Sequence, residues 1–143
     1  MAIFSDIGGK GYNLFEQERL ATFRYWKFSD DLPCNKFALS AAGFYKCNTE
    51  KDGSDECVCF YCGKALGDWD AEDDPFKEHK AHSSKCKFIN LGRRESELKV
   101  KEFLDLVESW CLNQMNKSMG IEAEERSRAF NTLQGIIEAK FRK

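Results

Sequence analysis

The chain has 143 residues, which is enough for one modest domain and an extension. Hydrophobic residues make up 42% of it and aromatic residues 13%, so a packed core can form. The formal net charge of −2 does not favour nucleic-acid binding, and the sequence contains no apolar run long enough to span a membrane.

The first 14 residues are predicted to form a mobile N-terminal segment. They contain Gly8, Gly9 and Gly11 and lack the long apolar stretch of a signal peptide. The chain also has seven cysteines, an odd number. We therefore expect free thiols rather than disulfides, and a reducing compartment, the nucleus or the cytoplasm.

A small α+β domain is predicted over residues 15–90. Leu20, Phe23 and Trp26 recur at a spacing of three and indicate a helix from about Leu14. Asn35 is placed to cap a second helix, which ends at a glycine. Apolar segments and an Asp-Gly turn then predict a three-stranded antiparallel sheet, with strands at 44–47, 57–61 and 64–69.

The cysteine-rich stretch predicts one metal site. Cys59 and Cys62 form a Cys-x-x-Cys pair, and His79 and Cys86 follow at spacings that can complete a tetrahedral zinc sphere. A redox pair would not need the later histidine and cysteine. His82 is an alternative ligand, one turn beyond His79. Four protein ligands leave no open position for a substrate, so we expect a structural zinc ion and no enzymatic activity.

The third strand and the acidic stretch after it predict a peptide-binding site. Five acidic residues lie within 68–74 and favour a cationic partner. The strand can accept an extended peptide along its edge. Leu66 and Trp69 can form a small apolar pocket, while Asp73 can pair with a free α-ammonium group. Core packing of Trp69 and a capping role for Asp73 are the alternatives.

From residue 98 the pattern changes to that of one long helix over 98–143, after a linker at 91–97. Its apolar residues form two stripes separated by a charged stretch and Gly120. A helix of that length cannot bury both stripes on so small a domain. We therefore expect helices of partner chains to cover the stripe residues, which are Val100, Leu104, Val107, Cys111, Met115, Phe130, Leu133 and Ile137.

These motifs together resemble the baculovirus IAP repeat (BIR) family. The similarity covers roughly residues 15–90 and rests on ligand spacing and intervening residues together. It includes Gly43-Phe44-Tyr45, Trp69, Asp73-Asp74-Pro75 and Glu78-His79. Asp74 and Pro75 also predict the start of a helix, as its N-cap and its first helical residue. The run 78–86, followed by a long helix, is most similar to the survivin branch of the family. The resemblance implies a zinc-binding α+β fold followed by one long C-terminal α-helix.

For function, the resemblance implies a subunit of the chromosomal passenger complex. The zinc domain would read the phosphorylated N-terminal tail of histone H-three. The long helix would bind a borealin-like chain and inner centromere protein, placing Aurora B kinase at the centromere and later at the spindle midzone and midbody. The alternative is an apoptosis inhibitor that binds Ala-first antagonist peptides or caspases.

The resemblance also assigns roles to single residues. It places the histone phosphate near Lys64 and His82, and a cationic tail residue near Asp52 and Asp55. Two positions depart from the survivin branch. Gly67 stands in place of a glutamate that helps to hold the amine, so more depends on Asp73. Glu95 stands in place of an aromatic residue at the dimer contact, which argues against a homodimer.

Overall fold

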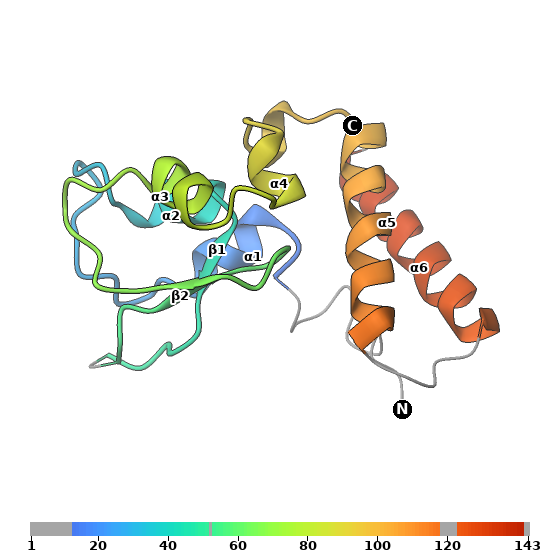
Figure 1. Ribbon diagram of the computed structural model, residues 1–143, viewed down its shortest axis with the longest axis horizontal. Coiled ribbons are helices and arrows are strands. Elements are labelled where there is room, and N and C mark those ends of the chain that lie inside the picture. The colour runs from blue at the N-terminus through green and yellow to red at the C-terminus, as the bar shows by residue number, and fades with distance from the viewer. Residues whose placement is uncertain (1–12, 52, 118–122, 142–143) are drawn as a thin grey trace. The chain divides into compact units, whose positions relative to one another are not determined.

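The computed structural model describes residues 13–51, 53–117 and 123–141 (Figure 1). The chain divides into two compact units, residues 13–96 and a second unit that begins at Glu97. The predicted N-terminal segment and Asp52 lie outside the described residues, apart from residues 13 and 14.

The first helix, α1, is shorter than predicted and spans Glu16–Ala21. The Glu18 carboxylate accepts a hydrogen bond of 3.2 Å from the backbone N–H of Phe15 at its start. At its end the Thr22 hydroxyl donates to the carbonyl of Arg19 at 2.6 Å. The chain then turns, and Phe23 and Trp26 pack edge to face with ring centroids 5.4 Å apart. The spacing of three therefore reflects a turn beyond the helix.

Helix α2 spans Lys36–Ala41 and confirms the predicted cap. The side chain of Asn35 accepts a hydrogen bond of 2.8 Å from the backbone N–H of Ala38. Gly43 follows the helix with φ of 98°, a left-handed conformation that glycine adopts without a steric cost. This turn leads directly into the sheet.

The three-stranded antiparallel sheet is also confirmed. Its strands are β1 (Phe44–Lys46), β2 (Cys57–Cys59) and β3 (Ala65–Leu66), in the order β1-β2-β3. Phe44 pairs with Cys59, and Cys57 pairs with Leu66 on the other side. Strand β3 is therefore an edge strand, with one side of its backbone unpaired within the sheet.

Helices α2 and α3 lie next to each other beside the sheet (Figure 1). Helix α3 spans Pro75–His82 and begins as predicted: the side chain of Asp74 accepts from the backbone N–H groups of Phe76 and Lys77. Two short helices follow, α4 (Lys87–Asn90) and the 3-10 helix η1 (Glu95–Glu97). The core of this unit consists of buried aromatic and aliphatic residues, among them Phe23, Leu39, Phe44, Phe88 and Ile89.

The described residues of the second unit form two helices within the range predicted as one long helix. Helix α5 spans Val100–Lys117 and α6 spans Ala123–Phe141, and they run side by side (Figure 1). The rings of Phe103 and Phe141 are 5.5 Å apart. In one straight helix these residues would be separated by roughly 57 Å. The helical character of the region is confirmed, but its continuity is not.

Apolar burial explains why the two helices pair. Val107 and Cys111 of α5 and Leu133 and Ile137 of α6 are all buried. Four of the eight predicted partner-binding residues are thus covered within the chain, so their burial does not require a partner. Val100, Leu104 and Phe130 are half-buried, and the side chain of Met115 lies outside the described part. Among the described residues, no helix is long and apolar enough to cross a membrane.

Candidate functional site

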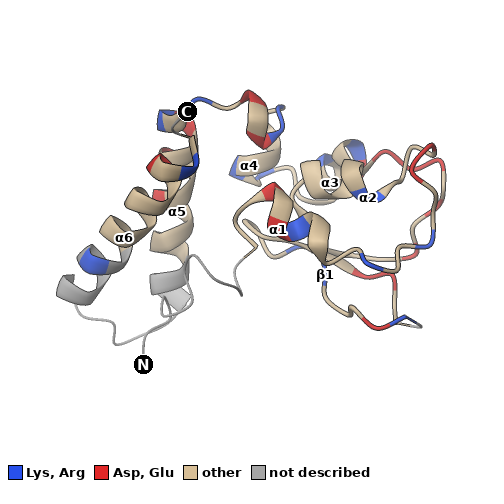
Figure 2. Ribbon diagram, turned by 180° about the vertical axis from the view of Figure 1, so that it is seen from behind, with Lys and Arg blue, Asp and Glu red and all other residues tan. Residues whose placement is uncertain are grey.

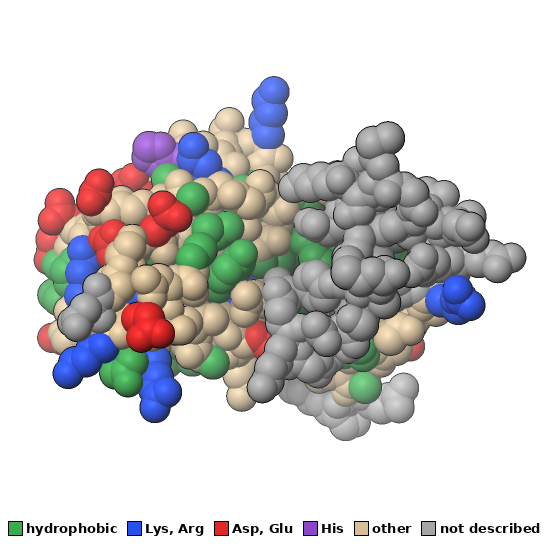
Figure 3. Space-filling model, turned by 90° about the horizontal axis from the view of Figure 1, so that it is seen from below, with side chains coloured by type: hydrophobic (Ala, Val, Ile, Leu, Met, Phe, Trp, Pro, Cys, Tyr) green, Lys and Arg blue, Asp and Glu red, His purple; other side chains and the backbone are tan. Residues whose placement is uncertain are grey.

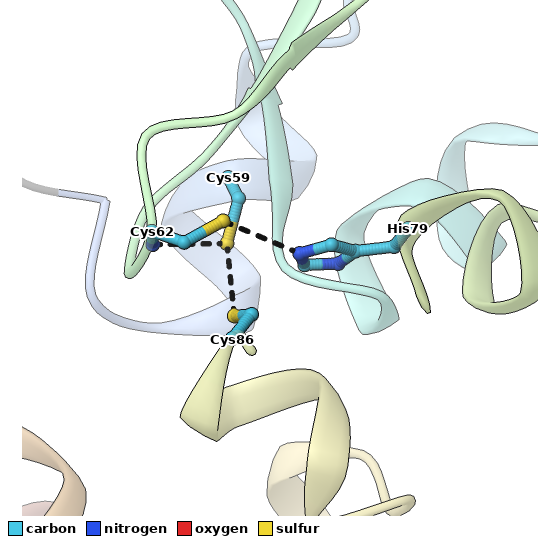
Figure 4. A group of neighbouring side chains, drawn as sticks. All are labelled: Cys59, Cys62, His79 and Cys86. Carbon is cyan, nitrogen blue, oxygen red and sulfur yellow. Dashed lines mark hydrogen bonds between the residues drawn. The ribbon is translucent and has the colours of Figure 1, made fainter. Parts of the chain in front are cut away.

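The four predicted metal ligands come together in the first unit. The ligand atoms of Cys59, Cys62, His79 and Cys86 all lie within 4.8 Å of one another (Figure 4). Cys59 ends β2, Cys62 lies in the turn after it, His79 belongs to α3, and Cys86 directly precedes α4. Segments distant in sequence thus present three sulfur atoms and one imidazole nitrogen to one point.

The turn after β2 aims its two sulfur atoms through backbone geometry. The N–H of Gly63 donates to the carbonyl of Cys59 at 3.0 Å, and Gly63 has φ of 75°. The backbone N–H groups of Tyr61 and Cys62 point at the sulfur of Cys59, at 3.3 and 3.5 Å. The hydroxyl of Ser83 donates to the sulfur of Cys62 at 3.2 Å. Such donors stabilise thiolates, the form in which cysteine binds a metal.

His79 is oriented by a backbone carbonyl. Its Nδ1 lies 2.7 Å from the carbonyl oxygen of Ala42, which can only accept, so Nδ1 carries the proton. Its Nε2 faces the cluster and lies 3.6 Å from the sulfur of Cys62. His82, the alternative ligand, is exposed and lies outside the cluster, with its Nε2 3.5 Å from a carboxylate oxygen of Glu78.

The electrostatics of the cluster favour a bound cation. Burial raises the pKa of the Cys59 thiol, whereas hydrogen bonds from Cys59 and Cys86 lower the pKa of Cys62. Burial disfavours a charged His79, but its contacts with Cys62 and Cys86 outweigh that effect and raise its pKa to about 9. Three sulfur atoms and one nitrogen within 4.8 Å of one another, on largely buried residues, match the ligands that zinc prefers, so this cluster can hold one zinc ion.

A second candidate site is a hollow of about 240 Å³ between β3 and α3. It contains four of the seven predicted peptide-binding residues, Leu66, Trp69, Asp73 and His82, and is completed by Gly67, Asp68 and Glu78. Three carboxylates and one imidazole surround it, which favours a cationic ligand. Acidic side chains are concentrated in the loops at the same end of the unit as α3 (Figure 2).

Trp69 and Asp73 are held firmly at this hollow. Trp69 is only 4% exposed, and its ring packs edge to face on Phe44 at 5.4 Å. Its indole N–H donates to the carbonyl of Leu66 at 3.2 Å, which ties it to β3. Asp73 accepts a hydrogen bond of 2.8 Å from the backbone N–H of Asp70. Trp69 is therefore both a core residue and a wall of the hollow.

The family model for the BIR, "Inhibitor of Apoptosis domain", matches residues 19–90, which include all four metal-binding residues and the hollow. The chain belongs to the BIR family. Its four-ligand cluster is therefore placed where BIR domains hold zinc.

Curated relatives extend the similarity beyond the BIR domain. Baculoviral IAP repeat-containing protein 5.2-B of Xenopus laevis is 39% identical over 127 residues, covering 89% of this chain and 79% of the relative. Baculoviral IAP repeat-containing protein 5 of Mus musculus is 35% identical over 120 residues, covering 84% and 85%. The predicted resemblance is confirmed, and the chain is a survivin-like member of the family.

Two predicted peptide residues of this BIR domain do not line the hollow, and a third lies outside the described residues. Asp55 accepts from the backbone N–H groups of Asp68 and Trp69, at 3.0 and 2.8 Å, and forms an ion pair of 2.8 Å with Lys27. Burial opposes its charge, yet these bonds keep its pKa below the ordinary value. It therefore supports the loop behind the hollow. Lys64 is exposed and does not line the hollow, and Asp52 lies outside the described residues.

Sequence reasoning missed Glu78 as a lining residue and Arg19 as a buried cation. Glu78 could have been found, because it lies four residues before His82 on one helix face. Arg19 is fully buried, with hydrogen bonds to the carbonyls of Ser40, Asn13 and Leu14 at 2.9 to 3.1 Å. Its guanidinium lies 4.5 Å from the ring centroid of Phe60. Desolvation lowers the pKa of Arg19 to about 10.

Proposed function

We propose that this survivin-like protein is a non-enzymatic subunit of the chromosomal passenger complex. The BIR domain, stabilised by a structural zinc ion, reads the phosphorylated N-terminal tail of histone H-three. Helices α5 and α6 bind a borealin-like chain and inner centromere protein. The assembly localises Aurora B kinase at the centromere, spindle midzone and midbody. At other times this protein is in the nucleus and the cytoplasm.

The observation that carries the histone-reading part is the acidic hollow next to an edge strand. An extended peptide can pair with the outer backbone of Ala65–Leu66 as an added strand. Its first residue then reaches the hollow, where Asp68, Asp73 and Glu78 offer counter-charges to a free α-ammonium group. Trp69 and Leu66 give an apolar wall for a small first side chain such as alanine.

Phosphate recognition depends on the balance between His82 and Glu78. Imidazole can donate to phosphate oxygens, but the neighbouring carboxylate, 3.5 Å away, repels them. Lys64 is exposed at the start of β3 and can add a positive charge. We therefore expect His82→Ala to erase the preference for a phosphorylated third residue, and Glu78→Gln to increase it.

Peptide titration tests this proposal with the zinc-loaded full chain. An Ala-first histone peptide should bind more tightly when its third residue, threonine, is phosphorylated, and acetylation of its α-amine should abolish binding. Asp73→Ala should weaken both forms by about tenfold, since a charged hydrogen bond is lost. Binding of the acetylated peptide with unchanged affinity would refute recognition of the terminus, and equal affinities for both phosphorylation states would refute phosphate reading.

The size of the helical unit supports partner binding. Two helices in about 45 residues can bury little apolar surface, so further helices would stabilise them considerably. Leu112 is 53% exposed and Leu104 is half-buried, so both offer apolar surface on α5. Partner chains can either pack on this surface or replace α6 against the buried stripe of α5.

Pull-down from mitotic cells tests whether partner chains bind the apolar surface of α5. Leu104→Glu combined with Leu112→Glu should prevent recovery of the borealin-like chain and inner centromere protein while leaving zinc content and histone-peptide binding intact. Glu108→Lys on the exposed side of α5 serves as a control for charge change alone. Normal recovery of both partners by the double variant would contradict assembly through this surface of α5.

One observation favours the apoptosis-inhibitor alternative. The acidic side chains of the hollow suit any free α-ammonium group, and Glu78 disfavours a phosphate. Unphosphorylated Ala-first antagonist peptides would fit the same hollow. This alternative predicts that such a peptide binds more tightly than the phosphorylated histone peptide and that Glu78→Gln does not improve its binding.

A further inference from the structure

Lys46 is a cation at a position where the sheet requires an apolar residue. In β1 the side chains of Phe44 and Lys46 are both buried, while Tyr45 between them is half-exposed. Lys46 is only 5% exposed and lies opposite Cys57, which is fully buried. Long aliphatic residues would satisfy this environment without the desolvation of a charge. The lysine therefore needs a compensating interaction.

Within the described part of the chain, that compensation is incomplete. The ammonium group of Lys46 donates to one acceptor there, the backbone carbonyl of Asn48, although it carries three protons. The described carboxylates form no ion pair with it. For a lysine that is only 5% exposed, a single neutral acceptor is unusual, because buried charges are normally paired.

Lys46 lines a second hollow of about 80 Å³, together with Tyr25, Trp26, Lys27, Lys51, Gly53 and Asp55. Lys27 is neutralised by its ion pair with Asp55, and it also donates to the carbonyl of Trp69 at 2.8 Å. Among the described lining residues, the cations that form no ion pair are therefore Lys46 and Lys51. Seen from below, the surface of this unit carries basic and acidic side chains among hydrophobic ones (Figure 3).

Aromatic residues provide the remaining walls. The indole N–H of Trp26 donates to the carbonyl of Cys34 at 2.9 Å, so the polar edge of this ring is already occupied. Tyr25 is 45% exposed, with the guanidinium of Arg24 lying 5.6 Å from its ring centroid. The volume has room for a group of only a few heavy atoms. Two ammonium groups and apolar walls at this scale suit a small anion.

We propose that this hollow binds a compact oxyanion, a phosphate or carboxylate group, against the ammonium groups of Lys46 and Lys51. It is separate from the acidic hollow beside β3, which selects for positive charge. Lysine is a point charge without the planar fork of arginine, so both oxyanions satisfy the same chemistry. The bound group replaces the missing counter-charge of Lys46.

The test uses the zinc-loaded full chain, with inorganic phosphate and acetate as separate probes and sodium chloride at matched ionic strength as the reference. NMR titration should show saturable shifts at Lys46, Lys51 and Tyr25 with at least one oxyanion and not with chloride. Lys46→Met should weaken that binding by about tenfold or more, since a charged contact is lost. Lys80→Met, which changes an exposed lysine of α3, should bind as wild type.

Stability measurements provide the second readout. Lys46→Met should retain zinc and unfold at the same or a higher temperature than wild type, because an apolar side chain replaces a buried charge. The oxyanion should raise the unfolding temperature of wild type but not that of Lys46→Met. An effect of phosphate alone, of acetate alone or of both supports the proposal and identifies which oxyanion the hollow accepts. Absence of saturable binding to either anion, or undiminished binding by Lys46→Met, would overturn the proposal.

Discussion

Residues 13–96 contain polar groups at the centre of their fold, whereas the helical unit is built around buried apolar side chains. The BIR domain encloses a cluster of four metal-binding residues and the guanidinium of Arg19. In α5 and α6 the described buried residues are apolar, as in Leu106, Leu133 and Ile137. The stability of the first unit therefore depends strongly on a few specific polar groups. That of the second unit is distributed over a stripe of apolar side chains on α5 and α6.

Metal removal should have the largest effect, and it should unfold the first unit without unfolding the second. A zinc site of this kind contributes about 10 kcal/mol or more of apparent binding free energy, most of it coupled to folding. Chelation, or Cys62→Ala, should therefore abolish the cooperative unfolding of residues 13–96 while α5 and α6 keep their helical signal. Elemental analysis and circular dichroism check both halves of this expectation. Ser84→Ala, beside the cluster but not a ligand, should keep one zinc ion per chain.

Changing Arg19 should have the next largest effect. Arg19→Met keeps much of the volume but leaves three backbone carbonyls without their donor, which should destabilise the BIR domain by about 4 kcal/mol. Arg19→Lys keeps the charge but not the planar guanidinium group, so its free energy of unfolding should lie between those of wild type and the methionine variant. Urea unfolding of the zinc-loaded protein measures this. Equal stability of all three proteins would mean that the carbonyl bonds contribute nothing.

A substitution that creates a cavity in the helical unit should destabilise that unit alone. Leu133 is 1% exposed, and Leu133→Ala should destabilise the pairing of α5 and α6 by about 2 kcal/mol. Hydrogen exchange of the α5 and α6 amides should accelerate, whereas amides of β1 and β2 should keep their protection. Asn131→Ala on the exposed side of α6 is the matched control. Acceleration across the sheet as well would show that the two units unfold together.

The smallest effect should be the contribution of Cys111 to the pH dependence of thermal stability. Burial raises the pKa of this thiol to about 12, above its value in an unfolded chain of about 8.5. The neutral thiol therefore stabilises the fold fully below about pH 8.5, and this contribution is lost as the pH rises towards 12. Wild type should lose more thermal stability between pH 7.5 and pH 10 than Cys111→Ala does. A parallel loss in both proteins would count against the burial of this thiol.

The sequence was informative where chemistry is local. Ligand spacing identified Cys59, Cys62, His79 and Cys86, and the caps of α2 and α3 followed from Asn35 and Asp74, since a cap involves residues within one helical turn. The predicted three-stranded antiparallel sheet also agrees with the structure. Periodicity defines an apolar face but not the element that covers it, so the pairing of α5 with α6 was not predicted.

Contacts between residues distant in sequence explain the other differences between the predictions and the structure. Asp55 was assigned to a peptide contact on the family resemblance, and nothing in its sequence neighbourhood indicates its ion pair with Lys27, 28 residues earlier. Arg19 and Lys46 are charged residues that the fold buries, and charge alone predicts exposure. The hollow beside β3 was predicted in part: Leu66, Trp69, Asp73 and His82 were assigned to it, and Glu78 was missed although its helical spacing from His82 places both on one face.

The positions of the four ligands also determine the order in which the chain can fold during synthesis. Three ligands lie between residues 59 and 79, but the tetrahedral set is incomplete until Cys86 has left the ribosome. At about 5 to 20 residues per second, the nascent BIR domain spends seconds without its full metal site. Helices α5 and α6 follow directly behind and are neighbours in sequence, so they can pair rapidly. Zinc supply during translation therefore decides whether the front of the chain is folded before its C-terminal helices emerge.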